Sequence, residues 1–184
     1  KLPSDVTLIM TKNTREALAK CSCNFYDNPS KKFKLIGVTG TKGKTTTTFM
    51  IKEILEKAGK KVGLIGTIAT YINGKKMADS ERTTPESLEL QRIFSQMVAE
   101  EVEYVVMEVS SQGLSMGRVD TLIFDYVIFS NLTQDHLDYH KTLDNYILEK
   151  QKLFNMTNES FAIINNDDIY KEYFILDNKN ITYG

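Results

Sequence analysis

The chain has few of the features that mark secreted, membrane-embedded or nucleic-acid-binding proteins. Its 184 residues include only two cysteines, Cys21 and Cys23, which are too few for a disulfide framework or a complete thiolate metal site. No uninterrupted apolar run approaches membrane-spanning length, and no charged-then-apolar leader is recognisable. The formal net charge of −1 indicates no general affinity for nucleic acid or an anionic membrane. We therefore expect free thiols in the cytoplasm, no nucleic-acid partner and no membrane partner.

What is present is typical of a globular domain with a sizeable core, with 41% hydrophobic and 26% charged residues. Strand-like and helix-like patterns alternate at the spacing of βαβ units, which predicts an α/β fold with a mainly parallel sheet flanked by helices and right-handed crossovers. Asn73-Gly74 predicts a hairpin turn that folds 75–78 back on the preceding strand. The expected strands are 34–39, 62–72, 104–109, 126–129, 161–164 and 181–183, and the expected helices are 45–58, 84–100, 143–155 and 169–176. Residues 1–33 are expected to form a connector with a short strand at 5–10 and a short helix at 14–21.

The most informative segment is Gly40-Thr41-Lys42-Gly43-Lys44-Thr45-Thr46, which lies between an apolar strand pattern and an amphipathic helix pattern. Glycines allow backbone N–H groups to approach phosphate oxygens, and the helix that follows contributes its positive dipole end. Lys44 can reach the β- and γ-phosphates, and the Thr45 hydroxyl can ligate Mg²⁺. The commonest phosphate-loop spacing requires a glycine where Val38 stands. A phosphate-binding loop is the prediction, and a simple glycine-rich turn is the alternative.

Two further polar clusters follow strands, and in parallel sheets such positions line ligand sites. Glu108 ends an apolar strand pattern in Glu108-Val109-Ser110-Ser111, where a buried carboxylate needs a cation such as Mg²⁺. The alternative is a glutamate that emerges into solvent at the strand end. Asp135-His136-Leu137-Asp138-Tyr139-His140 holds both histidines, which leaves open a transition-metal site, one histidine serving the nucleotide's metal, or two surface histidines.

Two other positions have simple structural explanations. Thr83-Thr84-Pro85 predicts a helix start with Thr84 as its cap, although a helix N-terminus also suits an anionic ligand. Lys150 lies within the expected helix 143–155, which Thr142 is expected to cap, and by itself indicates only a solvated face.

Taken together, these clusters resemble the Mur ligases, and within that family the enzymes that add the third residue of the peptidoglycan stem peptide. The resemblance covers most of residues 34–156. It rests on the following segments: 40–46, 83–85, 108–111, 131–140, and Lys150 with Leu153-Phe154. The family has Gly-Thr-x-Gly-Lys-Thr, which accounts for Val38. Two positions depart from the pattern: Arg82 and Met116 stand where some relatives carry polar amides that touch substrate.

The resemblance implies a role for each matched residue. Gly40, Thr41, Lys42, Gly43, Lys44, Thr45 and Thr46 would bind ATP. Thr45, Glu108, His136 and a carbamylated Lys150 would hold Mg²⁺, and Lys44, Glu108, His136 and Lys150 would be the catalytic set. Thr83, Thr84, Ser110 and Arg118 would contact the UDP-muramoyl-peptide.

The resemblance also implies a reaction and a domain plan. The reaction is ATP-dependent amide formation, in which the D-glutamate carboxylate of UDP-MurNAc-L-Ala-D-Glu attacks the γ-phosphate and a diamino acid then displaces phosphate from the acyl phosphate. Residues 1–33 would join a missing N-terminal UDP-binding domain to a central ATP-binding domain, 34–184. The central domain would be incomplete at its C-terminal end, and the amino-acid-binding domain would be absent. We expect a monomer from a bacterial cytoplasm that binds MgATP weakly and forms no product by itself.

Several alternatives remain open at the level of sequence. Other superfamily ligases, such as folylpolyglutamate or poly-γ-glutamate synthetases, share the phosphate loop. A nucleotide switch or motor ATPase would usually pair the loop with a strand that ends in aspartate, whereas here the strand contains Glu108. A metal-binding module would use His136 and His140. The sequence does not discriminate between meso-diaminopimelate and L-lysine as the diamino acid.

Overall fold

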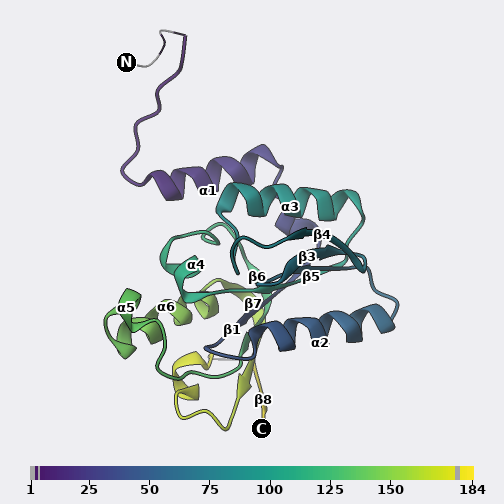
Figure 1. Cartoon of the computed structure of the whole chain (residues 1–184), viewed down its shortest axis with the longest axis vertical. Coiled ribbons are helices and arrows are strands. Elements are labelled where there is room, and N and C mark those ends of the chain that lie inside the picture. The colour runs from purple at the N-terminus through teal and green to yellow at the C-terminus, as the bar shows by residue number, and fades with distance from the viewer. Residues whose placement is uncertain (1–2, 4, 177–178) are drawn as a thin grey trace.

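A computed structural model describes residues 3, 5–176 and 179–184, and its centre is one eight-stranded sheet (Figure 1). The strand order is β4-β3-β2-β5-β1-β6-β7-β8. The strands are β1 (Lys34–Thr39), β2 (Val62–Ile65), β3 (Ala69–Ile72), β4 (Lys75–Asp79), β5 (Tyr104–Glu108), β6 (Phe124–Phe129), β7 (Thr157–Asn165) and β8 (Asn180–Tyr183). The helices are α1 (Thr14–Phe25), α2 (Lys44–Lys57), α3 (Ser87–Ala99), α4 (Ser111–Ser115), α5 (Leu137–His140) and α6 (Leu143–Asn155), with 3₁₀ turns η1 (Pro29–Lys32) and η2 (Lys171–Phe174).

Each pair of neighbouring strands from β2 through β5, β1, β6 and β7 to β8 is parallel, whereas β3 pairs antiparallel with both β2 and β4. The predicted α/β class with a mainly parallel sheet is therefore confirmed. β1 lies in the middle, between β5 and β6, and its last five residues are buried. This position brings the chain that leaves β1 beside the chain that leaves β5 and β6, because parallel neighbours end at the same edge of a sheet.

Helices cover both faces of the sheet, as Figure 1 shows. On one face, Ile51 and Leu55 of α2 pack against the smaller cluster of buried residues, which includes Ile36 and Val38 of β1. The larger cluster on the other face includes Phe94 of α3 and residues of α6. The long apolar strands, buried on both faces, are typical of a parallel sheet.

The predicted strand over 62–72 is wrong because the chain reverses inside it. β2 ends at Ile65, and β3 returns antiparallel with Gly63 paired to Ile72. Gly66 follows β2 and allows the Glu108 side chain to approach the backbone, since a Cβ at that position would lie 2.3 Å from Oε1 of Glu108. Asn73 and Gly74 then have φ angles of 49° and 78°, as the predicted hairpin turn requires, and β4 follows.

The predicted helix start at Thr84 is also wrong. α3 begins at Ser87, and its N-cap residue is Glu86, without a side-chain capping bond. The Thr84 hydroxyl instead donates to the backbone O of Glu108 at 3.0 Å. This hydrogen bond to a residue distant in the sequence replaces the helix cap that the local sequence favours.

The two remaining departures lie near the ends of the chain. Residues 5–10 form no strand and extend away from the body (Figure 1). The predicted helix 169–176 contains only the single 3₁₀ turn η2. The predicted helix at 14–21 is present and longer, as α1, and it packs against α3. Among the described residues, no helix is long and apolar enough to cross a membrane.

The predicted helix 143–155 and its cap are confirmed, because the Thr142 hydroxyl accepts a hydrogen bond from the Asn145 N–H at 3.2 Å. We expect Thr142→Ala to lower the free energy of unfolding by about 1 kcal/mol, since it leaves a helix N–H without its partner. Urea unfolding followed by circular dichroism measures the change. Thr142→Ser is the matched control because it keeps the acceptor oxygen, and an equal loss in both variants would contradict the capping role.

Candidate functional site

The glycine loop connects β1 to α2 at the carboxyl edge of the sheet. Gly40 and Gly43 have φ angles of 150° and 83°, which side-chain-bearing residues rarely adopt. Gly43 is the N-cap of α2, so Lys44 is the first helical residue. The loop therefore lies at a helix N-terminus, an arrangement that suits phosphate oxygens.

The segment that follows β6 holds this loop in shape. The Thr41 N–H donates to the backbone O of Asn131 at 2.8 Å, and the Lys42 N–H donates to Asn131 Oδ1 at 3.0 Å. Ser130 Oγ donates to the Lys42 carbonyl at 2.8 Å. The loop conformation thus depends on two segments that are far apart in the sequence.

Lys44 folds back over the loop, where its Nζ donates to the carbonyls of Gly40 at 2.8 Å and Thr41 at 3.0 Å. Burial lowers the pKa of Lys44, while the charges of Glu108 and Asp135 act in the opposite direction. The cation lies at the point where the phosphates of a bound nucleotide would meet the loop.

Glu108 ends β5 directly beside the loop, and its side chain is 1% exposed. Its Oε2 accepts hydrogen bonds from the hydroxyls of Thr45 and Thr67, each at 3.0 Å, and its Oε1 accepts from the Thr67 N–H at 2.9 Å. In the described part of the chain, no Lys, Arg or His lies within ion-pair distance of this carboxylate. A buried carboxylate beside a loop threonine is a fitting donor pair for a hard cation such as Mg²⁺.

Sequence reasoning missed Thr67, which makes two of the three hydrogen bonds to the Glu108 carboxylate. The signal was the Gly66-Thr67 pair inside an otherwise apolar run, which the prediction treated as one continuous strand. A glycine in such a run often marks a close backbone approach, and here it brings Thr67 to Glu108.

The sequence around Lys150 indicated only a solvated helix face, and the structure shows a buried lysine instead. It lies on the inner face of α6, is 1% exposed, and donates from Nζ to the Gly40 carbonyl at 2.9 Å. Burial lowers the pKa of Lys150 well below its usual value, and the nearby charge of Lys44 lowers it further. The amine is therefore held against the phosphate loop in an environment that favours its neutral form.

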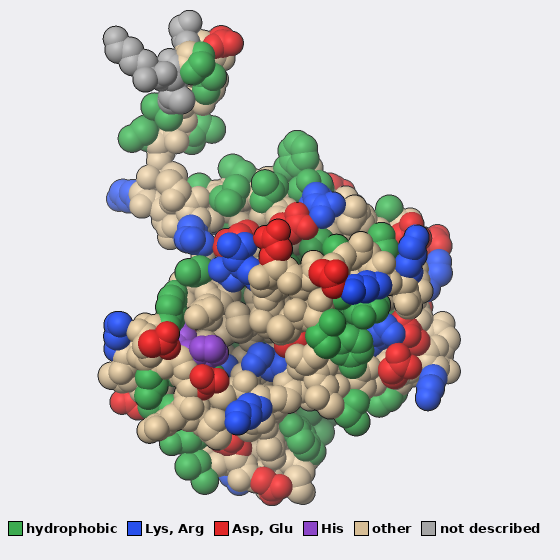
Figure 2. Space-filling model, viewed as in Figure 1, with side chains coloured by type: hydrophobic (Ala, Val, Ile, Leu, Met, Phe, Trp, Pro, Cys, Tyr) green, Lys and Arg blue, Asp and Glu red, His purple; other side chains and the backbone are tan. Residues whose placement is uncertain are grey.

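A polar pocket of about 450 Å³ adjoins these groups. Figure 2 shows Lys or Arg atoms beside His and Asp or Glu atoms on this face of the molecule. The pocket brings together six of the predicted site residues: Lys44, Thr83, Ser110, Arg118, His136 and Lys150. Its lining also includes Arg82, so Lys44, Arg82 and Arg118 bring positive charge to it, and Glu81 is the only acidic residue among the described lining residues. Such a lining suits an anionic ligand.

Thr84, Ser110 and Arg118 form one hydrogen-bonded unit on a wall of the pocket. The Thr84 hydroxyl lies 3.2 Å from Ser110 Oγ, and the Ser110 N–H donates to Thr84 Oγ1 at 3.0 Å. Arg118 donates from one guanidinium nitrogen to the Thr84 carbonyl at 3.0 Å, and its Nε lies 3.0 Å from Oε1 of Glu86. Thr84 is completely buried, so it supports Ser110 and Arg118 from behind rather than lining the pocket itself.

The two positions that depart from the family pattern also lie here. Arg82 lines the pocket directly. Met116 accepts a hydrogen bond at Sδ from Arg118 at 3.0 Å, so it helps to orient that guanidinium.

The two histidines have different environments. His136 is the N-cap of α5 with φ 52°, and its half-exposed side chain lines the pocket. His140 is buried, and its Nε2 lies 2.9 Å from Ser111 Oγ. Within the described residues there is no group of three or more His, Cys, Asp or Glu side chains placed to hold a metal. The structure thus places His136 on the pocket and His140 against Ser111.

Comparison with known families and proteins gives a consistent result. The model of the Mur ligase middle domain matches residues 38–184. The chain is 55% identical, over its full length, to UDP-N-acetylmuramoyl-L-alanyl-D-glutamate--2,6-diaminopimelate ligase 1 of Clostridium acetobutylicum. It is 57% identical, over 98% of its length, to the corresponding ligase of Clostridium botulinum. It spans only 38% and 37% of the lengths of these two relatives.

Solved structures share the fold. A UDP-N-acetylmuramoyl-L-alanyl-D-glutamate--2,6-diaminopimelate ligase superposes with a TM-score of 0.78 at 27% identity, covering 91% of this chain and 36% of that one. A folylpolyglutamate synthase of Mycobacterium tuberculosis, complexed with ADP and AMPPCP, has a TM-score of 0.73 at 14% identity, covering 90% of this chain and 46% of that one. The second likeness concerns the fold alone.

Proposed function

The chain belongs to the Mur ligase family through its middle domain, and from this premise we propose that it is the ATP-binding part of a longer peptidoglycan ligase. The reaction that we propose for the whole enzyme joins 2,6-diaminopimelate to UDP-MurNAc-L-Ala-D-Glu at the expense of ATP. Residues 1–33 then form the connector to an N-terminal UDP-binding domain, and 34–184 belong to the central domain. The observation that carries the proposal is the convergence of Lys44, Glu108 and Lys150 on one glycine loop.

The loop supplies what a nucleoside triphosphate requires. Gly43 to Thr46 would present the backbone N–H groups of the first turn of α2, and Lys44 adds a positive charge at the same place. Lys44 would stabilise the charge on the transferring phosphoryl group, because phosphoryl transfer depends mainly on positioning and electrostatic stabilisation.

Mg²⁺ fits the oxygen donors of the site. The Thr45 hydroxyl and the buried Glu108 carboxylate would hold one ion together with the phosphates, and His136 and a carbamylated Lys150 would hold a second. The ions would neutralise phosphate charge when bound. Carbamylation requires a neutral amine, which is the form that the surroundings of Lys150 favour, and it would convert that amine into an anionic two-oxygen ligand.

The polar pocket suits the anionic acceptor substrate. Thr83, Ser110 and Arg118 would bind the UDP-MurNAc-dipeptide and hold its D-glutamate carboxylate toward Lys44. Attack of this carboxylate on the γ-phosphate would give an acyl phosphate and ADP, and the amine of the diamino acid would then displace phosphate. The names of the relatives favour 2,6-diaminopimelate over L-lysine, and a bacterial cytoplasm is the matching compartment. A monomeric state stays a prediction.

Calorimetric titration of this chain with ATP and Mg²⁺ tests the nucleotide site. We expect weak binding by the wild-type chain and, for Lys44→Ala, a loss of affinity of roughly 10- to 100-fold, because a charged hydrogen-bonding partner of the phosphates is removed. Lys57→Ala is the matched control, since Lys57 is an exposed lysine at the other end of the same helix. Equal affinity of Lys44→Ala and wild type would overturn the phosphate-loop assignment.

The acceptor is tested in the full-length ligase that contains this segment. We expect product with UDP-MurNAc-L-Ala-D-Glu and 2,6-diaminopimelate, and far less product when L-lysine replaces the diamino acid. Turnover with a folate and glutamate in place of these substrates would overturn the assignment while leaving the nucleotide site intact.

A further inference from the structure

Tyr146 contacts several residues of the site, and the proposed function gives it no role. It lies on α6, one helical turn before Lys150, and is 1% exposed. Its hydroxyl is 3.2 Å from Oγ1 of Thr41, inside the phosphate loop. Lys150 Nζ is 4.5 Å from the centre of its ring, and the rings of His136 and His140 lie 6.2 Å and 5.1 Å away.

The other hydrogen bonds of Thr41 indicate which hydroxyl is the donor in the contact between Tyr146 and Thr41. Thr41 Oγ1 accepts from the Thr133 N–H at 3.0 Å and lies 3.2 Å from the Thr133 carbonyl, to which it can donate. A hydroxyl has one hydrogen and two lone pairs, so all three contacts are satisfied together when Tyr146 is the donor. Burial raises the pKa of the Tyr146 phenol, which keeps this hydrogen in place.

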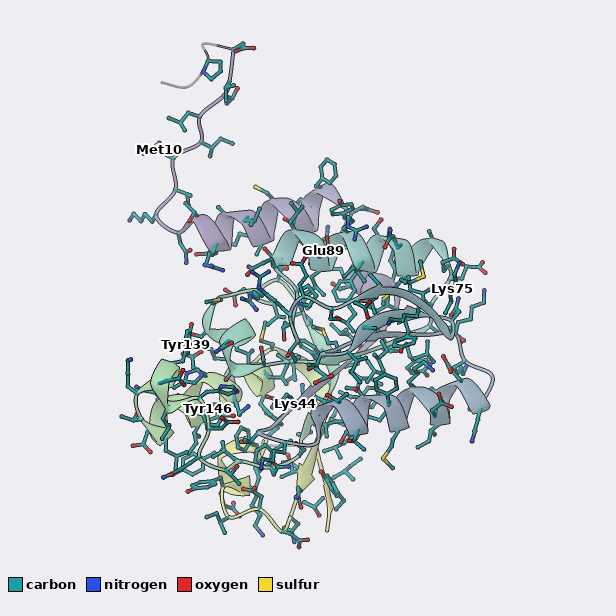
Figure 3. The ribbon with its side chains drawn as sticks, viewed as in Figure 1. Met10, Lys44, Lys75, Glu89, Tyr139 and Tyr146 are labelled. Carbon is teal, nitrogen blue, oxygen red and sulfur yellow. The ribbon has the colours of Figure 1, made fainter. Side chains whose placement is uncertain are left out.

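The ring of Tyr146 has a separate effect on Lys150. Residues four apart on a helix share a face, so the ring covers one side of the Lys150 amine while the Gly40 carbonyl accepts from it at 2.9 Å. The amine is thereby kept from bulk water and directed at the loop. Figure 3 shows Tyr146 of α6 and Lys44 at the start of α2 near each other in the interior, and both line the same pocket.

We propose that Tyr146 is a positioning residue, whose hydroxyl fixes the phosphate loop through Thr41 while its ring fixes Lys150 against the same loop. The proposal rests on the proposed nucleotide-binding function. One side chain would thus align the loop that follows β1 with Lys150 on α6. Tyr146 itself would not contact the reacting atoms.

The test removes the hydroxyl and keeps the ring. We expect Tyr146→Phe to weaken MgATP binding by this chain about fivefold, the equivalent of one net hydrogen bond. Thr41→Val should cause a loss at least as large, because it also removes the two contacts with Thr133. The double variant should lose no more than Thr41→Val alone, because the Tyr146 contact is already absent there. Tyr126→Phe is the matched control: Tyr126 lies on β6 and stacks on Phe161, away from the loop, and its variant should bind as the wild type does.

Hydrogen–deuterium exchange gives a second measurement that needs no nucleotide. In Tyr146→Phe we expect faster exchange in residues 40–46 and 131–133, with no change of the melting temperature beyond that of the control. Unchanged exchange, or additive losses in the double variant, would overturn the proposal even where wild-type binding supports the nucleotide site. If the wild-type chain binds no nucleotide, the proposed function fails for this chain, and the exchange experiment still decides whether Tyr146 fixes the loop.

Discussion

Replacing Gly40 with alanine is expected to abolish measurable nucleotide binding. The φ angle of 150° is unfavourable for any side-chain-bearing residue, and a Cβ at Gly40 would lie 2.0 Å from Ser130 Oγ and 3.0 Å from the Asn131 carbonyl. Ser130 cannot move away freely, since its hydroxyl holds the Lys42 carbonyl at 2.8 Å. The loop must therefore shift, and the Gly40 carbonyl that binds both Lys44 and Lys150 shifts with it.

Calorimetry with MgATP measures this effect, and we expect a loss of affinity of about 100-fold or more, because several phosphate contacts fail together. Gly59→Ala is the matched control: Gly59 also has a positive φ, 78°, but no atom lies within 4 Å of a built Cβ, so the substitution strains the backbone without a collision. That control should lose about 1 kcal/mol of stability and keep its affinity. Wild-type affinity in Gly40→Ala would show that the loop does not need its observed conformation.

The parts of this fold that the sequence predicts well are those fixed by local patterns. β1, the glycine loop and α2 follow one another within 24 residues of chain, and each is fixed by its own periodicity and turn residues. The Asn73-Gly74 turn and the Thr142 cap are local in the same way, and both are confirmed. The placement of the polar clusters at one sheet edge follows from the parallel topology alone.

The parts that could not be predicted depend on partners distant in the sequence. Thr84 has good local chemistry for a helix cap, but it is bound to Glu108 and Ser110 instead. Gly66 lies against the Glu108 carboxylate, and the Gly66-Thr67 pair signals a close approach there without identifying Glu108 as the neighbour. The roles of Thr67 and Tyr146 also become visible only when β5 and α6 are placed around the loop.

Lys150 is an intermediate case. Tyr146, Ile147, Lys150, Leu153 and Phe154 are the buried residues of α6, and their spacing places the lysine on the apolar face of the helix. A lysine at such a position is unusual enough to indicate function. The sequence pattern therefore contained the signal, although taken alone the residue was assigned to a solvated face, and only the resemblance to the Mur ligases gave it a role.

Lys150→Met should make the chain more stable while it inactivates the full-length ligase. Methionine has a similar length and can occupy the buried site without a polar group, so we expect the free energy of unfolding at neutral pH to rise by about 1 kcal/mol or more. In the ligase we expect a loss of activity of at least about 100-fold, because a proposed metal ligand is removed. Lys57→Met, an exposed lysine on α2, should change neither quantity.

The pH dependence separates this effect from ordinary repacking. Because burial lowers the pKa of Lys150 in the folded state, the unfolded chain binds more protons over the interval between that lowered pKa and the ordinary value of about 10.4. The stability of the wild type should therefore rise with pH across this interval, with up to about 1.4 kcal/mol per pH unit from Lys150, and this contribution should be absent in Lys150→Met. Parallel pH profiles from urea unfolding of the two proteins would contradict the buried neutral amine.

Bicarbonate then tests the modification itself. A carbamate that forms only on the folded protein stabilises it by mass action, so added bicarbonate should raise the stability of the wild type in proportion to its occupancy. Lys150→Met offers no amine at this position and should not respond, while every exposed lysine is common to both proteins. An equal response of the two proteins would assign the effect to the salt and leave Lys150 as an unmodified buried amine. A response confined to the wild type would show that the pocket which holds the lysine neutral also prepares it to become an anionic ligand.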